Sequence, residues 1–156
     1  DIIEPFLNNT FDYWDKVINI NYRSVLYGCR AVLPKMVERG YGRIVNIGSD
    51  AGRVGSMGET VYAGTKGGVI AFTKSLAREM VRKGITVNCV CPGPTDTPLF
   101  HSQPDKMKEA LIRAIPLRRL AKPEEIAYVV RFFADERAGY MTGQVISVSG
   151  GLTMVD

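Results

Sequence analysis

Hydrophobic positions along the chain fall into two kinds of segment, short continuous runs and longer periodic stretches. The short runs are rich in β-branched residues and bounded by glycine or proline, which is typical of buried strands; they span 43–47, 84–91 and 143–149. The longer stretches repeat apolar residues every three or four positions, which indicates helices; they span 11–39, 60–82 and 123–133. Because helices and strands alternate, the chain is predicted to be an α/β protein with a parallel sheet covered on both faces.

Two places do not fit this regular pattern. Residues 99–121 are the least ordered-looking part of the chain, because Pro104 breaks it and only 105–115 has the spacing of a short amphipathic helix. Asn19 and Asn21 interrupt the first helical stretch, because their amides compete for backbone hydrogen-bonding groups.

The candidate chemistry lies between Gly48 and Lys66. Ser49 directly follows the strand predicted at 43–47, so it lies at the carboxyl edge of the sheet, where open α/β sheets bind ligands. A glycine-rich loop then leads into the helix that carries Tyr62 and Lys66. These two residues are four positions apart, so their side chains share one face of that helix. A hydroxyl, a phenol and an ammonium are therefore predicted at one edge of the sheet.

Such a trio suits proton transfer to or from a secondary alcohol. A free phenol has a pKa of ~10, and an ammonium one helical turn away favours the phenolate. Lowering the pKa of Tyr62 by ~3 units needs ~4 kcal/mol of interaction, which one close charge in a partly dry site supplies. The hydroxyl of Ser49 holds the substrate oxygen beside the phenol. The alternative interpretation is structural: a capping serine, a half-buried tyrosine and a solvated lysine.

Ser49 followed by the run YAGTK at 62–66 resembles the signature of the short-chain dehydrogenase/reductase family. The resemblance implies an oxidoreductase that uses NAD or NADP, on a Rossmann-like doubly wound parallel sheet. In the implied roles, Tyr62 exchanges the alcohol proton, Lys66 lowers its pKa and binds the ribose hydroxyls, and Ser49 holds the substrate oxygen. Asn21 matches the asparagine that supports a water-mediated proton relay to the lysine; a solvated or locally bonded amide is the alternative.

The resemblance also implies two sets of binding contacts. The cofactor set is Tyr62, Lys66, Pro92, Gly93, Thr95 and Thr97. The substrate set is Ser49, Asp50, Tyr62 and Pro94. Because 92–97 resembles the family's proline–glycine segment beneath the nicotinamide, we expect Thr95 to meet the carboxamide through its backbone. By the same match, Thr97 reaches the amide or the pyrophosphate.

The resemblance covers essentially all 156 residues, but only the second half of the family's fold. A doubly wound sheet has about six strands in two halves, whereas this chain predicts three. The first half would carry the glycine-rich turn that grips the pyrophosphate, and the glycines of 48–55 have the wrong spacing to replace it. We therefore expect residues 1–156 to be the C-terminal part of a single domain whose N-terminal dinucleotide-binding half is absent. By the same resemblance, about 99–121 forms a mobile lid over the substrate.

The helix predicted at 60–82 is apolar on two faces, so we expect one face to meet the sheet and the other to meet another subunit. Gly64, Gly67 and Gly68 each cost ~1 kcal/mol in a helix relative to alanine, which indicates that something packs closely there. The family commonly pairs this helix and the preceding long one across a dimer interface. The resemblance therefore implies a homodimer or homotetramer formed through helices 11–39 and 60–82.

The composition of the chain limits which binding partners and which cell compartment we expect. The chain is 46% hydrophobic and 23% charged, with a formal net charge of +4, which is ordinary for a soluble globular protein. Its basic residues are scattered and no apolar run reaches membrane-spanning length, so we expect neither a nucleic-acid nor a membrane partner. With His101 as the only histidine, we expect no metal site. The odd cysteine count (Cys29, Cys89, Cys91) predicts buried free thiols and hence a reducing, cytoplasmic compartment.

The overall resemblance is closest to 3-oxoacyl-thioester reductases, and more loosely to dehydrogenases of hydroxyacyl-coenzyme A esters such as 2-hydroxycyclohexanecarboxyl-coenzyme A. It therefore implies a thioester of coenzyme A or acyl carrier protein as the substrate. The basic residues of 99–121 either meet such an anionic carrier or form a solvated face; they are Lys106, Lys108, Arg113, Arg118 and Arg119. A sugar or polyol dehydrogenase is one alternative. An inactive half-domain that acts only as an oligomerisation remnant is another.

Overall fold

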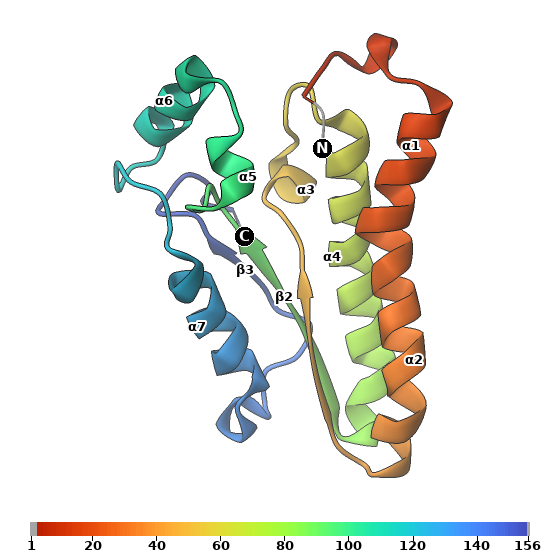
Figure 1. Cartoon of the computed structure of the whole chain (residues 1–156). Helices are drawn as coiled ribbons and strands as arrows, with labels where there is room; N and C mark the ends of the chain where they lie inside the picture. The colour runs from red at the N-terminus through yellow and green to blue at the C-terminus, as the bar shows by residue number, and fades with distance from the viewer. Residues whose placement is uncertain (1–2, 156) are drawn as a thin grey trace.

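The computed structural model describes residues 3–155, which contain one parallel sheet of three strands. In spatial order the strands are β1 (Gly42–Ile47), β2 (Ile85–Pro92) and β3 (Val145–Val148) (Figure 1). Ile47 at the end of β1 pairs with Val90. Pro92, the last residue of β2, pairs with Val148. The carboxyl ends of the strands therefore reach the same edge, and the predicted partial Rossmann-like α/β fold is confirmed.

Helices cover both faces of this sheet (Figure 1). One face carries α1 (Phe11–Ile18), α2 (Ser24–Glu38) and α4 (Thr60–Met80). The other face carries α7 (Pro123–Ala134). Short helices gather near the carboxyl edge of the strands: α3 (Ala51–Val54), α5 (Pro98–His101) and α6 (Asp105–Ala114). Single 3-10 turns span Phe6–Asn8, Val81–Lys83 and Glu136–Ala138.

The helix predicted over 11–39 is not a continuous α-helix. A π-helical turn at Asn19–Arg23 separates α1 from α2. Within this turn the amide of Asn21 donates a hydrogen bond to the backbone carbonyl of Val17, at 3.1 Å. Because this bond uses a carbonyl of the helical ladder, the helix widens at the position where asparagines interrupt its sequence pattern.

Residues 99–121 are more regular than their sequence pattern indicates. Helix α6 confirms the short amphipathic helix predicted at 105–115, whereas α5 is a helix that the pattern did not predict. The hydroxyl of Thr97 accepts a hydrogen bond from the amide of Phe100 at 3.3 Å and so caps the start of α5. The side chain of Phe100 is buried, which anchors this short helix to the body of the protein.

The main core lies between the sheet and helices α2 and α4. Its central cluster consists of Cys29, Ile44, Leu76, Ala77, Ile85 and Val87. A second cluster, nearer the carboxyl edge, consists of Val69, Cys89 and Cys91. The three cysteines are buried free thiols, as predicted. No helix among residues 3–155 combines the length and apolar character needed to cross a membrane.

A buried amide on β2 holds the loop that precedes β3. Asn88 donates a hydrogen bond to the carbonyl of Met141 at 2.9 Å and accepts one from the amide of Gln144 at 3.0 Å. The side chain of Asn88 has no exposed surface. Because water cannot replace these partners, the two bonds fix the start of β3 against β2.

Two of the three glycines singled out in α4 are closely packed within the chain. A Cβ atom on Gly67 would lie 3.2 Å from the carbonyl oxygen of Gly52, and one on Gly68 would lie 3.2 Å from the ring of Tyr22. A Cβ atom on Gly64 would meet nothing within 4 Å among residues 3–155. The predicted close packing is therefore confirmed for Gly67 and Gly68, whose neighbours are α3 and the π-helical turn.

Candidate active site

Ser49, Tyr62 and Lys66 come together at the carboxyl edge of the sheet. The hydroxyl of Ser49 accepts a hydrogen bond from the amide of Ala51 at 3.2 Å and is also hydrogen-bonded to the phenol of Tyr62. The ammonium of Lys66 lies 5.6 Å from the centre of the Tyr62 ring. It donates a hydrogen bond to the carbonyl of Ile47 at 3.1 Å. The three side chains that the sequence pattern groups together are therefore neighbours in the fold.

Close backbone contacts fix the positions of these residues. A Cβ atom on Gly48 would lie 2.8 Å from the sulfur atoms of two buried cysteines of β2, so only glycine lets the end of β1 lie against β2. A Cβ atom on Gly52 would lie 2.5 Å from the carbonyl carbon of Lys66. The turn that carries Ser49 is thus packed directly against the helical turn that carries Lys66.

The environment raises the pKa of Tyr62 above its ordinary value of 10.0. Burial of the phenol is the main cause; the hydrogen bond with Ser49 acts in the opposite direction, and the carboxylate of Glu59 adds to the rise. Burial also lowers the pKa of Lys66. These directions correct the expectation that Lys66 lowers the pKa of Tyr62, because the ammonium is directed at the carbonyl of Ile47. This shift favours the protonated phenol, which suits the role of a proton donor.

Tyr62 lines a cavity of about 390 Å³ between α1, α4 and α5. Besides Tyr62, its walls include Tyr13, Lys16, Val17, Asn21, Glu59 and Leu99. Asn21 is thus brought to the cavity of Tyr62, where its amide makes the local bond to Val17 described above. The presence of Leu99 shows that the segment expected to be a lid contributes to this cavity.

Four of these cavity residues were not identified by any motif: Tyr13, Lys16, Val17 and Glu59. Tyr13, Lys16 and Val17 are spaced three and four positions apart on α1, so they share one face. This spacing could have identified Tyr13 and Lys16 once α1 was placed beside the site. Glu59 lies just before α4 and accepts a hydrogen bond from the hydroxyl of Ser56 at 2.5 Å. No spacing or motif in the sequence distinguishes Glu59 from an ordinary surface carboxylate.

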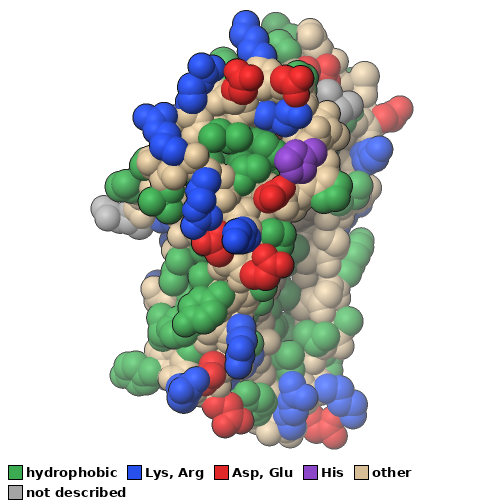
Figure 2. All heavy atoms as spheres, turned by 60° about the vertical axis from the view of Figure 1, so that its left-hand side comes forward, with side chains coloured by type: hydrophobic (Ala, Val, Ile, Leu, Met, Phe, Trp, Pro, Cys, Tyr) green, Lys and Arg blue, Asp and Glu red, His purple; other side chains and the backbone are tan. Residues whose placement is uncertain are grey.

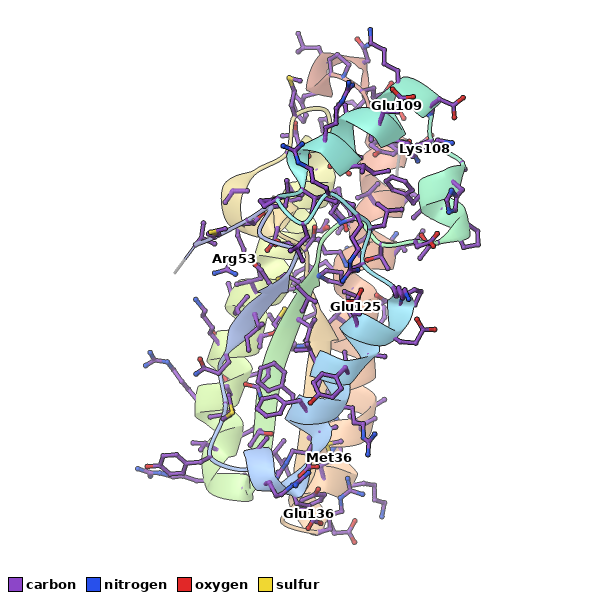
Figure 3. The ribbon with its side chains drawn as sticks, turned by 90° about the vertical axis from the view of Figure 1, so that its left-hand side faces the viewer. Met36, Arg53, Lys108, Glu109, Glu125 and Glu136 are labelled. Carbon is purple, nitrogen blue, oxygen red and sulfur yellow. The ribbon has the colours of Figure 1, made fainter. Side chains whose placement is uncertain are left out.

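Asp50 does not join the group at Tyr62. Its carboxylate is buried and accepts a hydrogen bond from the hydroxyl of Ser147 on β3. Arg53 donates to the same hydroxyl at 2.7 Å and to the carbonyl of Val155 at 2.8 Å. Figure 3 shows Arg53 beside the sheet, near the C-terminal tail. The carboxylate of Asp50 therefore faces β3, and the substrate contact expected of Asp50 from the sequence stays a prediction.

Pro94 also lies apart from Tyr62. It lines a separate cavity of about 120 Å³ together with Ser149. The neighbouring Gly93 donates a backbone hydrogen bond to Val148 at 2.9 Å, and a Cβ atom on it would lie 2.7 Å from the Cα atom of Ser149. Glycine is thus needed at position 93 so that the chain leaving β2 can pass β3 closely.

The threonines of the same turn use their hydroxyls within the chain. Thr95 donates to the carbonyl of Gly93 at 2.9 Å, and the hydroxyl of Thr97 caps α5. These bonds shape the connection from Pro92, at the end of β2, to α5. The cofactor contacts expected at Pro92, Gly93, Thr95 and Thr97, like the substrate contact expected at Pro94, stay predictions.

The face formed by α5, α6 and α7 carries charges of both signs (Figure 2). Lys108 pairs with Asp105 at 2.8 Å, and Arg119 pairs with Glu125 at 2.7 Å. Arg118 donates to a backbone carbonyl. Three of the five basic side chains singled out in 99–121 therefore have partners within the chain, and the contact with an anionic carrier stays a prediction.

Comparison with known families decides the identity of the fold. Residues 2–153 match the family model described as enoyl-(acyl carrier protein) reductase. The chain belongs to the short-chain dehydrogenase/reductase family. The resemblance inferred from the spacing of Ser49, Tyr62 and Lys66 is thereby confirmed.

Similar members of the short-chain dehydrogenase/reductase family include reductases of acyl thioesters. The 3-oxoacyl-[acyl-carrier-protein] reductase of Thermotoga maritima is 43% identical over 141 residues, which are 90% of this chain and 57% of the relative. The same-named enzyme of Pseudomonas aeruginosa is 46% identical over 143 residues, 92% of this chain and 58% of the relative. An acetoacetyl-CoA reductase of Allochromatium vinosum is 43% identical over 142 residues, which are 91% of this chain and 58% of the relative. The chain thus spans somewhat more than half the length of these relatives.

The residues at the sheet edge fit a nicotinamide dinucleotide, the cofactor typical of short-chain dehydrogenases/reductases. Lys66 has three N–H donors, one of which is on the carbonyl of Ile47. Its other N–H donors lie beside the phenol of Tyr62 at the carboxyl edge of the sheet. Such donors can bind the hydroxyl groups of a ribose. We therefore expect Tyr62 and Lys66 to hold the ribose next to the nicotinamide.

Proposed function

We propose that the protein containing this chain is an NAD(P)-dependent oxidoreductase that interconverts a ketone and a secondary alcohol on a 3-oxoacyl or hydroxyacyl thioester. The observation that carries the proposal is the hydrogen-bonded pair of Ser49 and Tyr62, with Lys66 one helical turn from Tyr62. Of the three, Tyr62 lines a cavity. The names of the relatives support the substrate class, since they act on acyl-carrier-protein and coenzyme A thioesters.

In the direction of reduction, the hydroxyl of Ser49 donates a hydrogen bond to the carbonyl oxygen of the substrate. A bound reduced nicotinamide would supply the hydride that the carbonyl carbon accepts. Tyr62 transfers its phenolic proton to the oxygen as negative charge develops there, and the product is the alcohol. This leaves a phenolate on Tyr62, one helical turn from Lys66. Asn21, in the wall of the same cavity, is the residue we assign to the return of a proton through water.

The protonation state of Tyr62 makes the rates of reduction and oxidation depend on pH in opposite senses. A protonated phenol can donate a proton to the ketone, whereas oxidation of the alcohol requires the phenolate. We expect kcat/KM for reduction to fall, and kcat/KM for oxidation to rise, as the pH approaches the pKa of Tyr62 from below. Measuring both rates across pH tests this, and a reduction rate that increases with pH through neutrality would contradict it.

We also propose that the protein forms a homodimer or homotetramer through α1–α2 and α4. Large exposed apolar side chains at Ile20, Tyr27 and Val32 support this, as does the open space beside Gly64. Light scattering of the purified protein measures the assembly directly, and a monomeric mass would contradict the proposal. The cytoplasmic location fits the buried free cysteines and stays a prediction.

The substrate class is tested with the protein expressed from its complete gene. Acetoacetyl-CoA, a 3-oxoacyl-acyl carrier protein and a keto sugar are each supplied with NADH and with NADPH, and loss of the reduced nicotinamide is followed by absorbance. The proposal expects the thioesters to have the higher kcat/KM. Turnover of the keto sugar alone would support a sugar or polyol dehydrogenase instead. Failure to bind either dinucleotide saturably would support an oligomerisation remnant.

A further inference from the structure

A chain of polar contacts links the turn that carries Ser49 to the far strand of the sheet. Asp50 follows Ser49, and its carboxylate accepts a hydrogen bond from the hydroxyl of Ser147 on β3. Arg53, on the next turn of chain, donates to Ser147 and to the carbonyl of Val155. Since β2 lies between β1 and β3, this link reaches across the carboxyl end of the central strand.

The burial of Asp50 is costly for the fold. Only 7% of the residue is exposed, and its second carboxylate oxygen is buried without a hydrogen-bond partner among residues 3–155. A buried carboxylate loses its hydration, and well-packed apolar side chains of similar volume often serve stability equally well or better. Stability alone therefore gives no reason for an aspartate at this position, next to Ser49.

The turn is also held from the opposite side. The backbone of Gly52 packs on Lys66 so closely that a Cβ atom would lie 2.5 Å from the Lys66 carbonyl carbon. Between these two anchors the hydroxyl of Ser49 accepts from the amide of Ala51 and meets the phenol of Tyr62. The contact with α4 fixes how near the turn lies to Lys66, and the link through Asp50 fixes its position relative to β3.

We propose that Asp50 is a positioning residue: with Ser147 and Arg53 it holds the turn of Ser49 so that the Ser49 hydroxyl reaches Tyr62. In this role Asp50 acts through Ser49. The inference rests on the proposed function for the role of the Ser49–Tyr62 pair. The geometry of the link is independent of which thioester or alcohol is turned over.

Tyr62 can report the position of Ser49, because the hydrogen bond from Ser49 affects the pKa of its phenol. The titration is followed by NMR with tyrosine labelled at the ring carbon that carries the hydroxyl, and Tyr62→Phe assigns the signal. We expect Ser49→Ala, Asp50→Ala and Ser147→Ala each to raise the pKa of Tyr62 by roughly 0.4 to 1, the equivalent of one hydrogen bond. In a Ser49→Ala background, Asp50→Ala is expected to add nothing.

Two further variants make the test specific. Asp50→Asn keeps an oxygen acceptor for Ser147, so it is expected to restore the wild-type titration. Ser149→Ala is the matched control, because this buried serine exchanges hydrogen bonds with the backbone of Thr153 and not with the turn of Ser49. It is expected to leave the pKa of Tyr62 unchanged.

The inference is overturned if Ser147→Ala and Asp50→Ala leave the titration of Tyr62 as it is in the wild type. It is equally overturned if the effect of either substitution persists when Ser49 is already alanine. Should Asp50→Ala fail to fold, Ser147→Ala alone and combined with Ser49→Ala decides the question. The titration needs neither cofactor nor turnover, so a protein that lacks reductase activity would contradict the proposed function without affecting this test.

Discussion

Replacing Gly52 with alanine places a methyl group against the backbone of α4. The added Cβ atom would lie 2.5 Å from the amide nitrogen of Gly67 and from the carbonyl carbon of Lys66. Since backbone atoms cannot rotate away, α3 and α4 must separate by roughly 1 Å to restore ordinary contact. Overpacking costs about 1–3 kcal/mol, and alanine recovers about 0.5–1 kcal/mol relative to glycine in a helix. The net loss of stability is about 0–2.5 kcal/mol, or a fall in Tm of up to about 10 °C.

Thermal unfolding followed by circular dichroism measures this change. The matched control is Gly28→Ala in α2, where an added Cβ atom meets nothing within 4 Å among residues 3–155. There alanine is expected to raise stability by about 0.5–1 kcal/mol. A Gly52→Ala protein as stable as the Gly28→Ala protein would refute the reasoning, because α3 would then not be packed on α4 as described.

Three further predictions concern stability. Asn88→Ala removes two buried hydrogen bonds to the loop at 141–144 and should cost about 2–4 kcal/mol in urea unfolding; a cost below about 1 kcal/mol would contradict the contacts. The pKa of Glu125 is lowered to about 2, chiefly by hydrogen bonds from Arg119. The ionised Glu125 therefore stabilises the fold above its ordinary pKa, and this contribution is lost as the pH falls toward about 2. The Tm difference between wild type and Glu125→Gln should therefore vanish near that pH, and a constant difference would disprove the linkage. The raised pKa of Tyr62 affects stability at alkaline pH. Its contribution to the stability of the fold is fully present below the ordinary pKa of 10.0 and decreases above it. The Tm of Tyr62→Phe should therefore fall less than the Tm of the wild type between about pH 9 and 11.

The strands and the central trio could be predicted because their signals are local. A β-branched run that ends at Gly48 indicates the strand before Ser49, and the four-residue spacing of Tyr62 and Lys66 fixes their shared face. The π-helical turn at Asn19–Arg23 was only indicated, because the asparagines show that the ladder is disturbed and do not show how it is repaired.

Contacts between distant residues could not be predicted in this way. Asp50 and Ser147 are 97 positions apart, so no spacing rule connects them. The direction of the Tyr62 pKa shift also depends on three-dimensional surroundings. Spacing places Lys66 on the correct face, but it does not reveal that the carbonyl of Ile47 accepts its hydrogen bond or that burial of the phenol outweighs other effects.

The central claim is that the phenol of Tyr62 delivers the proton in ketone reduction. The most direct measurement compares kcat for a 3-oxoacyl thioester in the wild type and in Tyr62→Phe, together with the Kd of the reduced nicotinamide cofactor in both. The account predicts that kcat falls by roughly 10²- to 10⁴-fold, the usual contribution of a general acid, while the Kd changes little. Near-normal turnover in the Tyr62→Phe protein would contradict the account.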